Sequence, residues 1–250
     1  MPESAPERFS APGPDARALA EEKSAAICRA ENKKGGGFMK SGGVEIVPVV
    51  YGRSVMPESM ICPGGAKDRF RPIVFMIYLI RIGKRLILAD AGCETMPDFD
   101  MTDFIGPVRA LAQLHIAPGD ITDVVITHAH HDHIESVKYF TNAAIYIQQD
   151  EYENGKAYFT PALRVNTFDG GLDLGDGVRV VKIGGHSVGS CVVEITVGDK
   201  TYVIAGDECY QRECLDRRIP TASAFDSEKS REFINKYSSG KYTVLLCHDQ

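Results

Sequence analysis

The chain has 250 residues, a formal net charge of −6 and 25% charged residues, which is ordinary for a globular protein. This length can bury a large core in one or two domains, and the acidic balance argues against nucleic acid or an anionic membrane as partner. No run reaches the roughly 18 apolar residues that begin to suggest a membrane span. The seven cysteines lack the spacing of a disulfide framework, and the N-terminus lacks a signal-peptide pattern, so we expect reduced thiols and a cytoplasmic location.

The first 40 residues differ from the rest of the sequence. A proline-rich leader precedes an Ala- and Glu-rich stretch, 15–31, that is compatible with a helix, and the segment KKGGG follows as a flexible breaker. Too few large apolar residues occur here to bury a core. We therefore expect an N-terminal arm over 1–40, partly helical or disordered, and one folded domain over 41–250.

The folded domain begins with strand-like segments. Apolar runs over 44–52, 73–82 and 85–90 predict three strands, and a short Gly-Lys turn predicts a hairpin between the last two. Between the first two runs, residues 54–72 contain glycine and proline and are expected to form a long loop. Long loops in compact domains are often functional.

Helices are fewer than strands in the remaining sequence. One helix is predicted over 107–115, with proline at an early position, and another over 227–237. Strands outnumber helices and are expected as hairpins rather than βαβ units, which favours an α+β layered sandwich over a doubly wound sheet. The further predicted strands cover 123–127, 143–149, 178–183, 191–197, 201–206 and 243–247.

The segment THAHHDHIES, residues 127–136, carries four of the seven histidines. Extended backbone alternates sides, so His128 and His130 are expected to point the same way from the end of a strand. If a helix follows, Asp132 and His133 project from its first turn, while His131 points away. Imidazole and carboxylate are ligands that zinc and similar divalent ions prefer, so this segment predicts two adjacent groups of metal ligands.

Further candidate ligands stand at strand ends elsewhere. His186 lies in the segment GGHSVGS, where glycines are expected to let the backbone approach a metal closely. Asp207, His248 and Asp90 each follow a predicted strand. Each residue alone is compatible with a turn or tail position, but together they indicate a metal site.

The order of these residues resembles the metallo-β-lactamase superfamily, whose signature is a His-x-His-x-Asp-His segment. Here the segment is residues 128–133, and the later ligand positions follow in the family's order over a resemblance that covers about 44–250. The resemblance implies a four-layer αβ/βα sandwich of two mixed sheets flanked by helices, with 41–250 as its catalytic domain. The site is then expected along one edge of the paired sheets.

The resemblance also implies a role for each candidate ligand. Two divalent metal ions are expected, with zinc as the first choice and iron or manganese as alternatives. Asp207 bridges the two ions, and Asp90 orients a ligand histidine from behind. The remaining ligands are His128, His130 and His186 for one ion, and Asp132, His133 and His248 for the other.

Two such ions activate a water molecule and polarise a carbonyl, which implies a hydrolase. Asp132, beside the metals, is expected to shuttle a proton. Tyr210 resembles the tyrosine of the N-acyl-homoserine lactone lactonases, whose phenol contacts the substrate. We therefore expect a small-molecule lactone or ester as substrate, best an N-acyl-homoserine lactone as in quorum quenching, and neither nucleic acid nor membrane as partner. A homodimer is compatible with the sequence.

Two departures from the family pattern affect the expected substrate pocket but no ligand. Ile134-Glu135-Ser136 stands where glycines are usual, and Ser187-Val188 replaces the usual Thr-Pro. The alternative functions are a thioester hydrolase of the hydroxyacylglutathione type, another β-lactamase-fold hydrolase, and a mononuclear iron persulfide dioxygenase, against which His248 counts. A metal-dependent binding protein without activity is a further alternative.

Overall fold

The computed structural model describes residues 39–41, 43–97 and 99–249. The expectations for residues 1–38, including the candidate helix at 15–31, fall outside these residues. Met39 and Lys40, at the end of the expected arm, lie in a short strand that pairs antiparallel with the next strand. Among the described residues, no helix is both long enough and apolar enough to cross a membrane.

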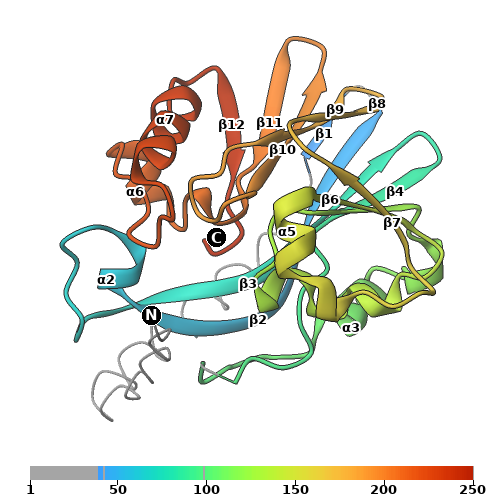
Figure 1. The fold of residues 1–250 in the computed structure, drawn as a ribbon, viewed down its shortest axis with the longest axis horizontal. Helices are drawn as coiled ribbons and strands as arrows, with labels where there is room; N and C mark the ends of the chain where they lie inside the picture. Colours follow the sequence, from blue (N-terminus) through green and yellow to red (C-terminus); the bar gives the residue numbers. More distant parts are fainter. Residues whose placement is uncertain (1–38, 42, 98, 250) are drawn as a thin grey trace.

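Two mixed sheets form the frame of the described chain (Figure 1). One sheet has seven strands in the order β1-β2-β3-β4-β5-β6-β7, and the other has five in the order β12-β11-β10-β9-β8. The strands of the first sheet are β1 (Met39–Ser41), β2 (Val44–Pro57), β3 (Phe70–Ile82), β4 (Arg85–Ala89), β5 (Asp123–Ile126), β6 (Ala144–Gln148) and β7 (Arg164–Phe168). Those of the second are β8 (Leu172–Gly175), β9 (Val178–Lys182), β10 (Cys191–Val197), β11 (Lys200–Ile204) and β12 (Tyr242–Leu245).

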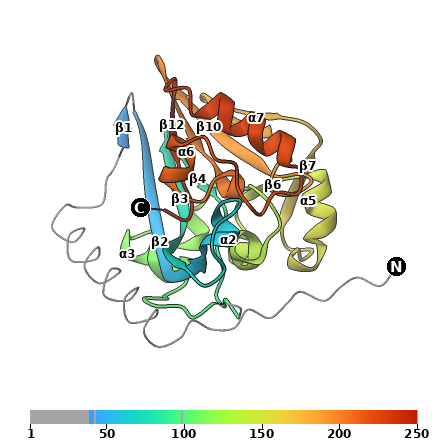
Figure 2. The same ribbon diagram turned by 90° about the vertical axis from the view of Figure 1, so that its left-hand side faces the viewer.

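The helices connect these strands and cover the outer faces of the sheets. In Figures 1 and 2, α7 and α6 lie beside the second sheet and α3 lies against the first. The α-helices are α2 (Glu58–Ile61), α3 (Pro107–Gln113), α4 (His131–Ile134), α5 (Gln149–Asn154), α6 (Arg212–Asp216) and α7 (Ser227–Tyr237). Short 3₁₀ helices are η1 (Pro118–Asp120), η2 (Glu135–Tyr139), η3 (Lys156–Tyr158) and η4 (Gly206–Glu208).

The two hydrophobic clusters explain why the fold has four layers. Between the sheets, Met76 and Ile87 of the first sheet share a buried cluster with Val193 and Ile204 of the second. The alternate side chains of β3 point to the opposite, outer face of the sheet. There Ile77 belongs to a second buried cluster, which also contains Leu111 of α3 and Phe233 of α7. Because successive side chains of a strand face opposite sides, β3 is apolar on both faces and is covered on both. The α+β sandwich expected from the sequence is confirmed.

Two details of the expected topology are wrong. The loop expected over 54–72 is shorter, because β2 continues to Pro57 and pairs with the start of β3 at Phe70, leaving α2 in the connection. The strands also do not all form hairpins: β4, β5, β6 and β7 run parallel to one another. Parallel neighbours need a crossover connection, and the short helices that provide it after β5 and β6 lack a clear helical periodicity in the sequence.

This topology places several strand ends at one edge of the sandwich. The backbone N–H of Asp90, directly after β4, bonds to the carbonyl of Val125 in β5, and the histidine segment then follows β5. In the second sheet, β11 and β12 are parallel, so the residues that follow each of them emerge together. The expected site residues stand at these ends.

Candidate metal centre

The histidine segment adopts the local structure expected from its sequence. β5 ends at Ile126, and His130 is the N-cap of α4 with an extended backbone. Asp132 and His133 lie in the first turn of that one-turn helix. The change from strand to helix within a few residues is what turns these side chains toward two neighbouring points.

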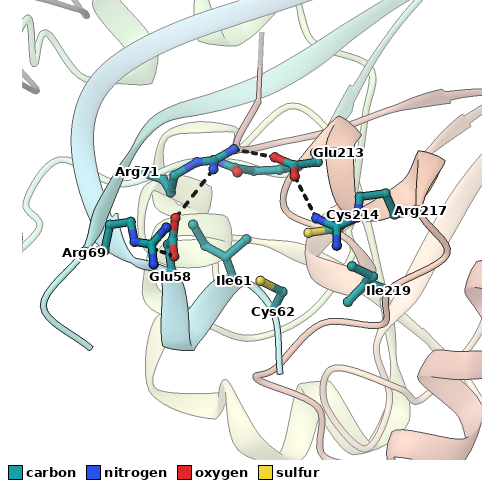
Figure 3. A pocket seen from close by; sticks show the side chains of 10 residues that line it. Glu58, Ile61, Cys62, Arg69, Arg71, Glu213, Cys214, Arg217 and Ile219 are labelled. Atoms are coloured by element: carbon teal, nitrogen blue, oxygen red, sulfur yellow. Dashed lines mark hydrogen bonds and ion pairs between the residues drawn. The ribbon is translucent and has the colours of Figure 1, made fainter. Parts of the chain in front are cut away.

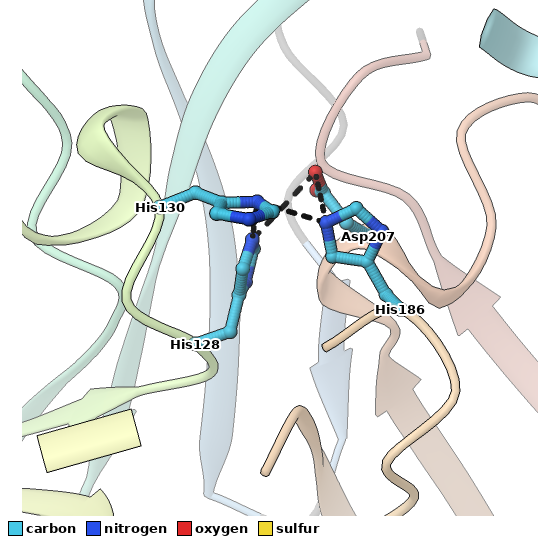
Figure 4. A group of neighbouring side chains, drawn as sticks. All are labelled: His128, His130, His186 and Asp207. Carbon is cyan, nitrogen blue, oxygen red and sulfur yellow. Dashed lines mark hydrogen bonds and ion pairs between the residues drawn. The ribbon is translucent and has the colours of Figure 1, made fainter. Parts of the chain in front are cut away.

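The first group of potential ligands combines this segment with the loop after β9 and with η4, which follows β11. The side chains of His128, His130, His186 and Asp207 point toward one another (Figure 4), and their ligand atoms lie within 4.8 Å of one another. His130 Nδ1 lies 2.9 Å from His128 Nε2 and 2.9 Å from His186 Nε2. We call these four residues the first cluster.

The second group consists of Asp132, His133 and His248, whose ligand atoms also lie within 4.8 Å of one another. His133 Nε2 is 3.4 Å from Asp132 Oδ2, and His248 Nε2 is 3.6 Å from the same oxygen. We call these three residues the second cluster. The structure therefore brings the seven candidate ligands named from the sequence into two adjacent groups.

Asp207 lies between the two clusters. Its Oδ2 is 3.5 Å from His186 Nε2 and 3.8 Å from His128 Nε2. Its Oδ1 is 3.1 Å from His133 Nε2 and 3.0 Å from His248 Nε2. One oxygen thus faces each cluster, which is the arrangement a bridging carboxylate requires.

The unsatisfied nitrogens of the site fit divalent metal ions. An N–H on His130 Nδ1 can be donated to His128 or to His186 but not well to both, so hydrogen bonds among the rings cannot satisfy all three nitrogens. His133 Nε2 is buried close to Asp207 and Asp132 but makes no hydrogen bond of good geometry with either, and a poorly satisfied buried nitrogen is costly. A cation at each cluster would take the place of protons on these rings and use the nitrogen lone pairs. The mixture of imidazole and carboxylate is typical of zinc and similar ions.

Residues behind the clusters fix the orientation of the rings. Asp90 Oδ2 lies 2.8 Å from His133 Nδ1, so the histidine expected to be oriented by Asp90 is His133. Asp90 also accepts hydrogen bonds from the backbone N–H and the hydroxyl of Thr127. His248 Nδ1 donates to the carbonyl of Val74 at 2.9 Å. In both histidines, the contact at Nδ1 leaves Nε2 directed into the centre, as is usual for metal ligands.

Burial sets the protonation of the first cluster. Without a bound ion, burial lowers the pKa of His128 well below its usual value, and the charge on His133 lowers it further. Burial also lowers the pKa of His186 to about 4. Both rings are therefore neutral at neutral pH and can ligate a metal. Burial opposes ionisation of Asp207, but His133 and His248 outweigh this effect and hold its pKa well below its usual range.

Tyr210, the tyrosine that resembles the substrate-contacting residue of the lactonases, lies beside both clusters. It is 5% exposed, and its ring centroid is 5.3 Å from that of His248 and 6.0 Å from that of His186. Burial, followed by the charge of Asp207, raises the pKa of its phenol well above the usual value. The phenol is therefore protonated at neutral pH and remains a hydrogen-bond donor.

His131 points away from the clusters, in agreement with the sequence. Its Nε2 donates to the carbonyl of Thr95 at 2.8 Å, and its Nδ1 lies 3.1 Å from the hydroxyl of Tyr158. These contacts are on the side of α4 away from the candidate ligands. His131 therefore connects α4 to its surroundings and belongs to neither cluster.

The residues that depart from the family pattern after the histidines are mainly structural. Ile134 and Ser136 are buried, and the backbone N–H of Ser136 bonds to the carbonyl of Gly92. Glu135 accepts a hydrogen bond from the backbone N–H of Glu94 at 2.7 Å and forms an ion pair with Lys138. These contacts stabilise the core and the loop after β4.

Sequence reasoning missed two buried glutamates beside the site, Glu151 and Glu208. Glu208 Oε1 accepts hydrogen bonds from the backbone N–H groups of Gly185 and His186, each at 3.2 Å. The glycines of GGHSVGS were expected to make room for a metal. Instead, a Cβ at Gly185 would collide with Glu208 Oε2, so this glycine makes room for a buried carboxylate. No sequence pattern signals these contacts, because the partners are distant in the chain.

A separate cavity of about 180 Å³ lies between α2 and α6 (Figure 3). Arg69 and Arg71 form ion pairs with Glu58, while Arg71 and Arg217 form ion pairs with Glu213. None of the expected site residues lines this cavity. Its arginines already have carboxylate partners, so it is not the candidate active site.

With the fold and the centre in view, comparison with known proteins identifies the family. The family model of the metallo-β-lactamase superfamily matches residues 76–248. This match covers most of the chain and includes both clusters, so the protein belongs to the metallo-β-lactamase superfamily. Its fold and its groups of histidine and aspartate are those of a metal-dependent hydrolase of this family.

Among particular relatives, two kinds of protein stand out. The chain is 27% identical over 150 residues to a probable metallo-hydrolase of Methanocaldococcus jannaschii, a match covering 60% of this chain and 66% of the relative. It is 28% identical over 212 residues to an N-acyl homoserine lactonase of Bacillus thuringiensis, covering 74% of this chain and 83% of the lactonase. The lactonase match therefore extends over more of both chains.

Solved structures share the fold at lower sequence identity. A probable metal-dependent hydrolase from Staphylococcus aureus has a TM-score of 0.75 at 20% identity, covering 84% of this chain and 91% of the other. An N-acyl homoserine lactone hydrolase, with the product N-hexanoyl-L-homoserine at its catalytic metal centre, has a TM-score of 0.70 at 21% identity, covering 84% of this chain and 94% of the other.

Proposed function

We propose that this protein is a dinuclear metal hydrolase that opens a lactone, and that its best substrate class is the N-acyl-homoserine lactones. The observation that carries the proposal is the position of Asp207, which turns one oxygen to each of two ligand clusters. A single metal would leave one of these clusters without a role. The similarity to an N-acyl homoserine lactonase supports the choice of substrate.

When bound, a pair of divalent ions, zinc as the first choice, supplies an activated water and polarises the substrate carbonyl. The first ion would be held by His128, His130 and His186, and the second by Asp132, His133 and His248, with Asp207 shared between them. The protein's own contribution is then to position the substrate and to move a proton.

Asp132 and Tyr210 carry these two tasks in the proposal. Asp132 Oδ2 lies beside both His133 Nε2 and His248 Nε2, a position from which a carboxylate can take a proton and deliver it to the leaving alkoxide. The Tyr210 phenol, kept protonated by burial and by Asp207, can donate a hydrogen bond to the carbonyl or ring oxygen of a lactone. Ring opening at a buried site needs both functions.

The second cluster also separates this proposal from its alternatives. A mononuclear iron dioxygenase needs only the first cluster, whereas here Asp132, His133 and His248 form a second group of comparable compactness. Thioester hydrolysis uses the same metal chemistry and differs only in the substrate. Turnover of a panel of lactones and thioesters therefore distinguishes a lactonase from a thioester hydrolase.

The test is metal analysis together with a lactone panel on one preparation. We expect two metal ions per chain and proton release on addition of N-acyl-homoserine lactones, with little turnover of a glutathione thioester. Protein treated with a chelator is the control and should be inactive. Protein that contains two metal ions per chain and opens none of the lactones would contradict the proposal, and one iron per chain with oxygen uptake on a persulfide would support the dioxygenase.

A further inference from the structure

One buried carboxylate contacts both loops of the first cluster. Glu151, in α5, is 1% exposed. Its Oε2 accepts a hydrogen bond from the backbone N–H of Ala129 at 2.8 Å. Its Oε1 accepts hydrogen bonds from Ser187 Oγ at 2.7 Å and from the backbone N–H of Gly189 at 2.7 Å. A buried polar group is costly unless it is hydrogen-bonded, and three donors satisfy the oxygens of this side chain.

These donors belong to the two segments that carry the three histidines of the first cluster. Ala129 stands between His128 and His130, and Ser187 follows His186. The two segments are far apart in the sequence, and Glu151 is bonded to both. Among the described residues, Glu151 makes no hydrogen bond to a member of the second cluster. Its contacts therefore act most directly on the backbone that carries the histidines of the first cluster.

The surroundings of Glu151 hold its carboxylate in place. Gln148 is the N-cap of α5, and its side-chain oxygen accepts hydrogen bonds from the backbone N–H groups of Asp150 and Glu151. A Cβ at Gly189 would collide with the amide oxygen of Gln148 and lie 2.9 Å from Glu151 Cγ. The absence of a side chain at Gly189 thus lets the His186 loop approach the carboxylate closely.

We propose that Glu151 is a positioning residue that holds the His128–His130 segment and the His186 loop at the spacing the first metal requires. This inference rests on the proposed metal function and assigns a specific role within it. Partners behind metal ligands orient the ligands, and their loss costs roughly 10–100-fold in metal affinity or activity. Glu151 acts one step further away, through the backbone of the two ligand segments.

The informative substitution is Glu151→Gln. The amide keeps one acceptor oxygen, but its NH₂ group turns a donor toward a backbone N–H that previously donated to the carboxylate. One of the two segments must then move away. We expect metal affinity at the first cluster to fall roughly 10–100-fold, while affinity at the second cluster stays unchanged.

Cobalt(II) titration, followed by visible absorption, measures each cluster separately when the other is disabled. His133→Ala leaves the first cluster available, and His186→Ala leaves the second. Glu151→Gln is introduced into both backgrounds after removal of the native metal. We expect the loss of affinity in the His133→Ala background alone. If Glu151 had only a general role in folding, its substitution would lower the cobalt affinity in both backgrounds.

Two further variants complete the experiment. Glu153→Gln changes an exposed glutamate of the same helix and should leave the cobalt affinity unchanged in both backgrounds. Ser187→Ala removes one donor to Glu151 and should give a smaller loss in the His133→Ala background, which keeps the test decisive if Glu151→Gln folds poorly. Equal losses in both backgrounds, or no loss at the first cluster, would overturn the inference.

The proposed function fails in a different way. Unsubstituted protein that binds no cobalt would refute the metal function before Glu151 is compared. Protein that binds two cobalt ions per chain but opens no lactone would refute the substrate assignment, and the comparison between the two backgrounds would still decide the role of Glu151.

Discussion

His131 and His133 stand two residues apart in the sequence and have opposite surroundings in the structure. His131 contacts Thr95 and Tyr158 at the outer side of α4, whereas His133 lies between Asp90 and Asp207. We expect His131→Ala to leave two metal ions per chain and His133→Ala to lose the second ion, as measured by elemental analysis. Loss of a metal ion in His131→Ala would show that the assignment of these two histidines is wrong.

Tyr210 gives a second prediction for a single residue. Tyr210→Phe removes a hydrogen-bond donor from the centre, where one such donor is worth about 10²-fold in kcat, and leaves the ligands in place. We expect kcat for lactone opening to fall by roughly that factor, with unchanged metal content. Tyr237→Phe is the control, because the hydroxyl of Tyr237 donates to Glu194 and not to a site residue. Equal kcat values for Tyr210→Phe and the unsubstituted protein would exclude this role.

Helix α7 shows how a single element supports the site. Its N-cap, Asp226, accepts hydrogen bonds from the backbone N–H groups of Glu228 and Lys229, and its own N–H bonds to the carbonyl of Gly185 beside His186. The helix therefore begins where the His186 loop is attached. Its bounds were predictable because the capping residue and the apolar positions follow local rules.

Asp226→Ala tests the importance of this cap. Loss of an N-cap costs about 1 kcal/mol, which for a domain of 150–250 residues lowers Tm by roughly 2–4 °C. Thermal unfolding followed by circular dichroism measures the change. Ser227→Ala, at the next and exposed position, is the control and should leave Tm within about 1 °C of the unsubstituted value, on the usual size of exposed-surface substitutions. Equal Tm values for both variants would mean that the cap is dispensable.

At the scale of the whole molecule, the clusters join the two sheets. His128, His130 and His133 follow β5 of the first sheet, whereas Asp207 and His248 follow β11 and β12 of the second. Metal bound to the folded chain but not to the unfolded chain stabilises it by mass action, by about 2.7 kcal/mol at a free metal concentration of 100 Kd.

Removal of metal should therefore lower Tm by several degrees, and added zinc should restore it. Scanning calorimetry before and after chelation measures this shift. Both clusters are incomplete in a variant that carries His133→Ala together with His186→Ala, so the chelator should have little effect on its Tm. A similar shift in that variant would indicate that the chelator acts elsewhere.

Buried thiols predict how the stability of the whole chain depends on pH. Burial raises the pKa of Cys93 to about 12 and that of Cys214 to about 11, from 9.0 for a free thiol. The folded state then keeps protons that the unfolded state loses, so this stability is complete below about pH 9 and falls as the pH rises toward the folded values. Denaturant unfolding of metal-free protein should show this decline between pH 9 and 11. The decline in stability with pH should be shallower in Cys93→Ser. An unchanged decline in that variant would show that the Cys93 thiol does not contribute to it.

The spacing of the main candidate ligands and the class of fold could be predicted from the sequence. His128, His130, Asp132 and His133 are separated by a few residues, so the change from strand to helix alone fixes their directions. The long apolar strands, buried on both faces, likewise indicated a layered sandwich. Strands β7 and β8 escaped prediction because their side chains are mostly exposed or half-buried and lack a clear apolar alternation.

The residues that support these candidate ligands could be identified only from the folded positions of the chain. Thr127 holds Asp90, Glu208 holds the His186 loop, and Glu151 connects that loop to Ala129. Each contact joins segments separated by at least 20 residues, and a buried carboxylate that accepts backbone hydrogen bonds has no periodic or local signature. Metal ligands can be recognised from their chemistry and spacing, whereas their supports are defined by the folded positions of distant backbone N–H groups.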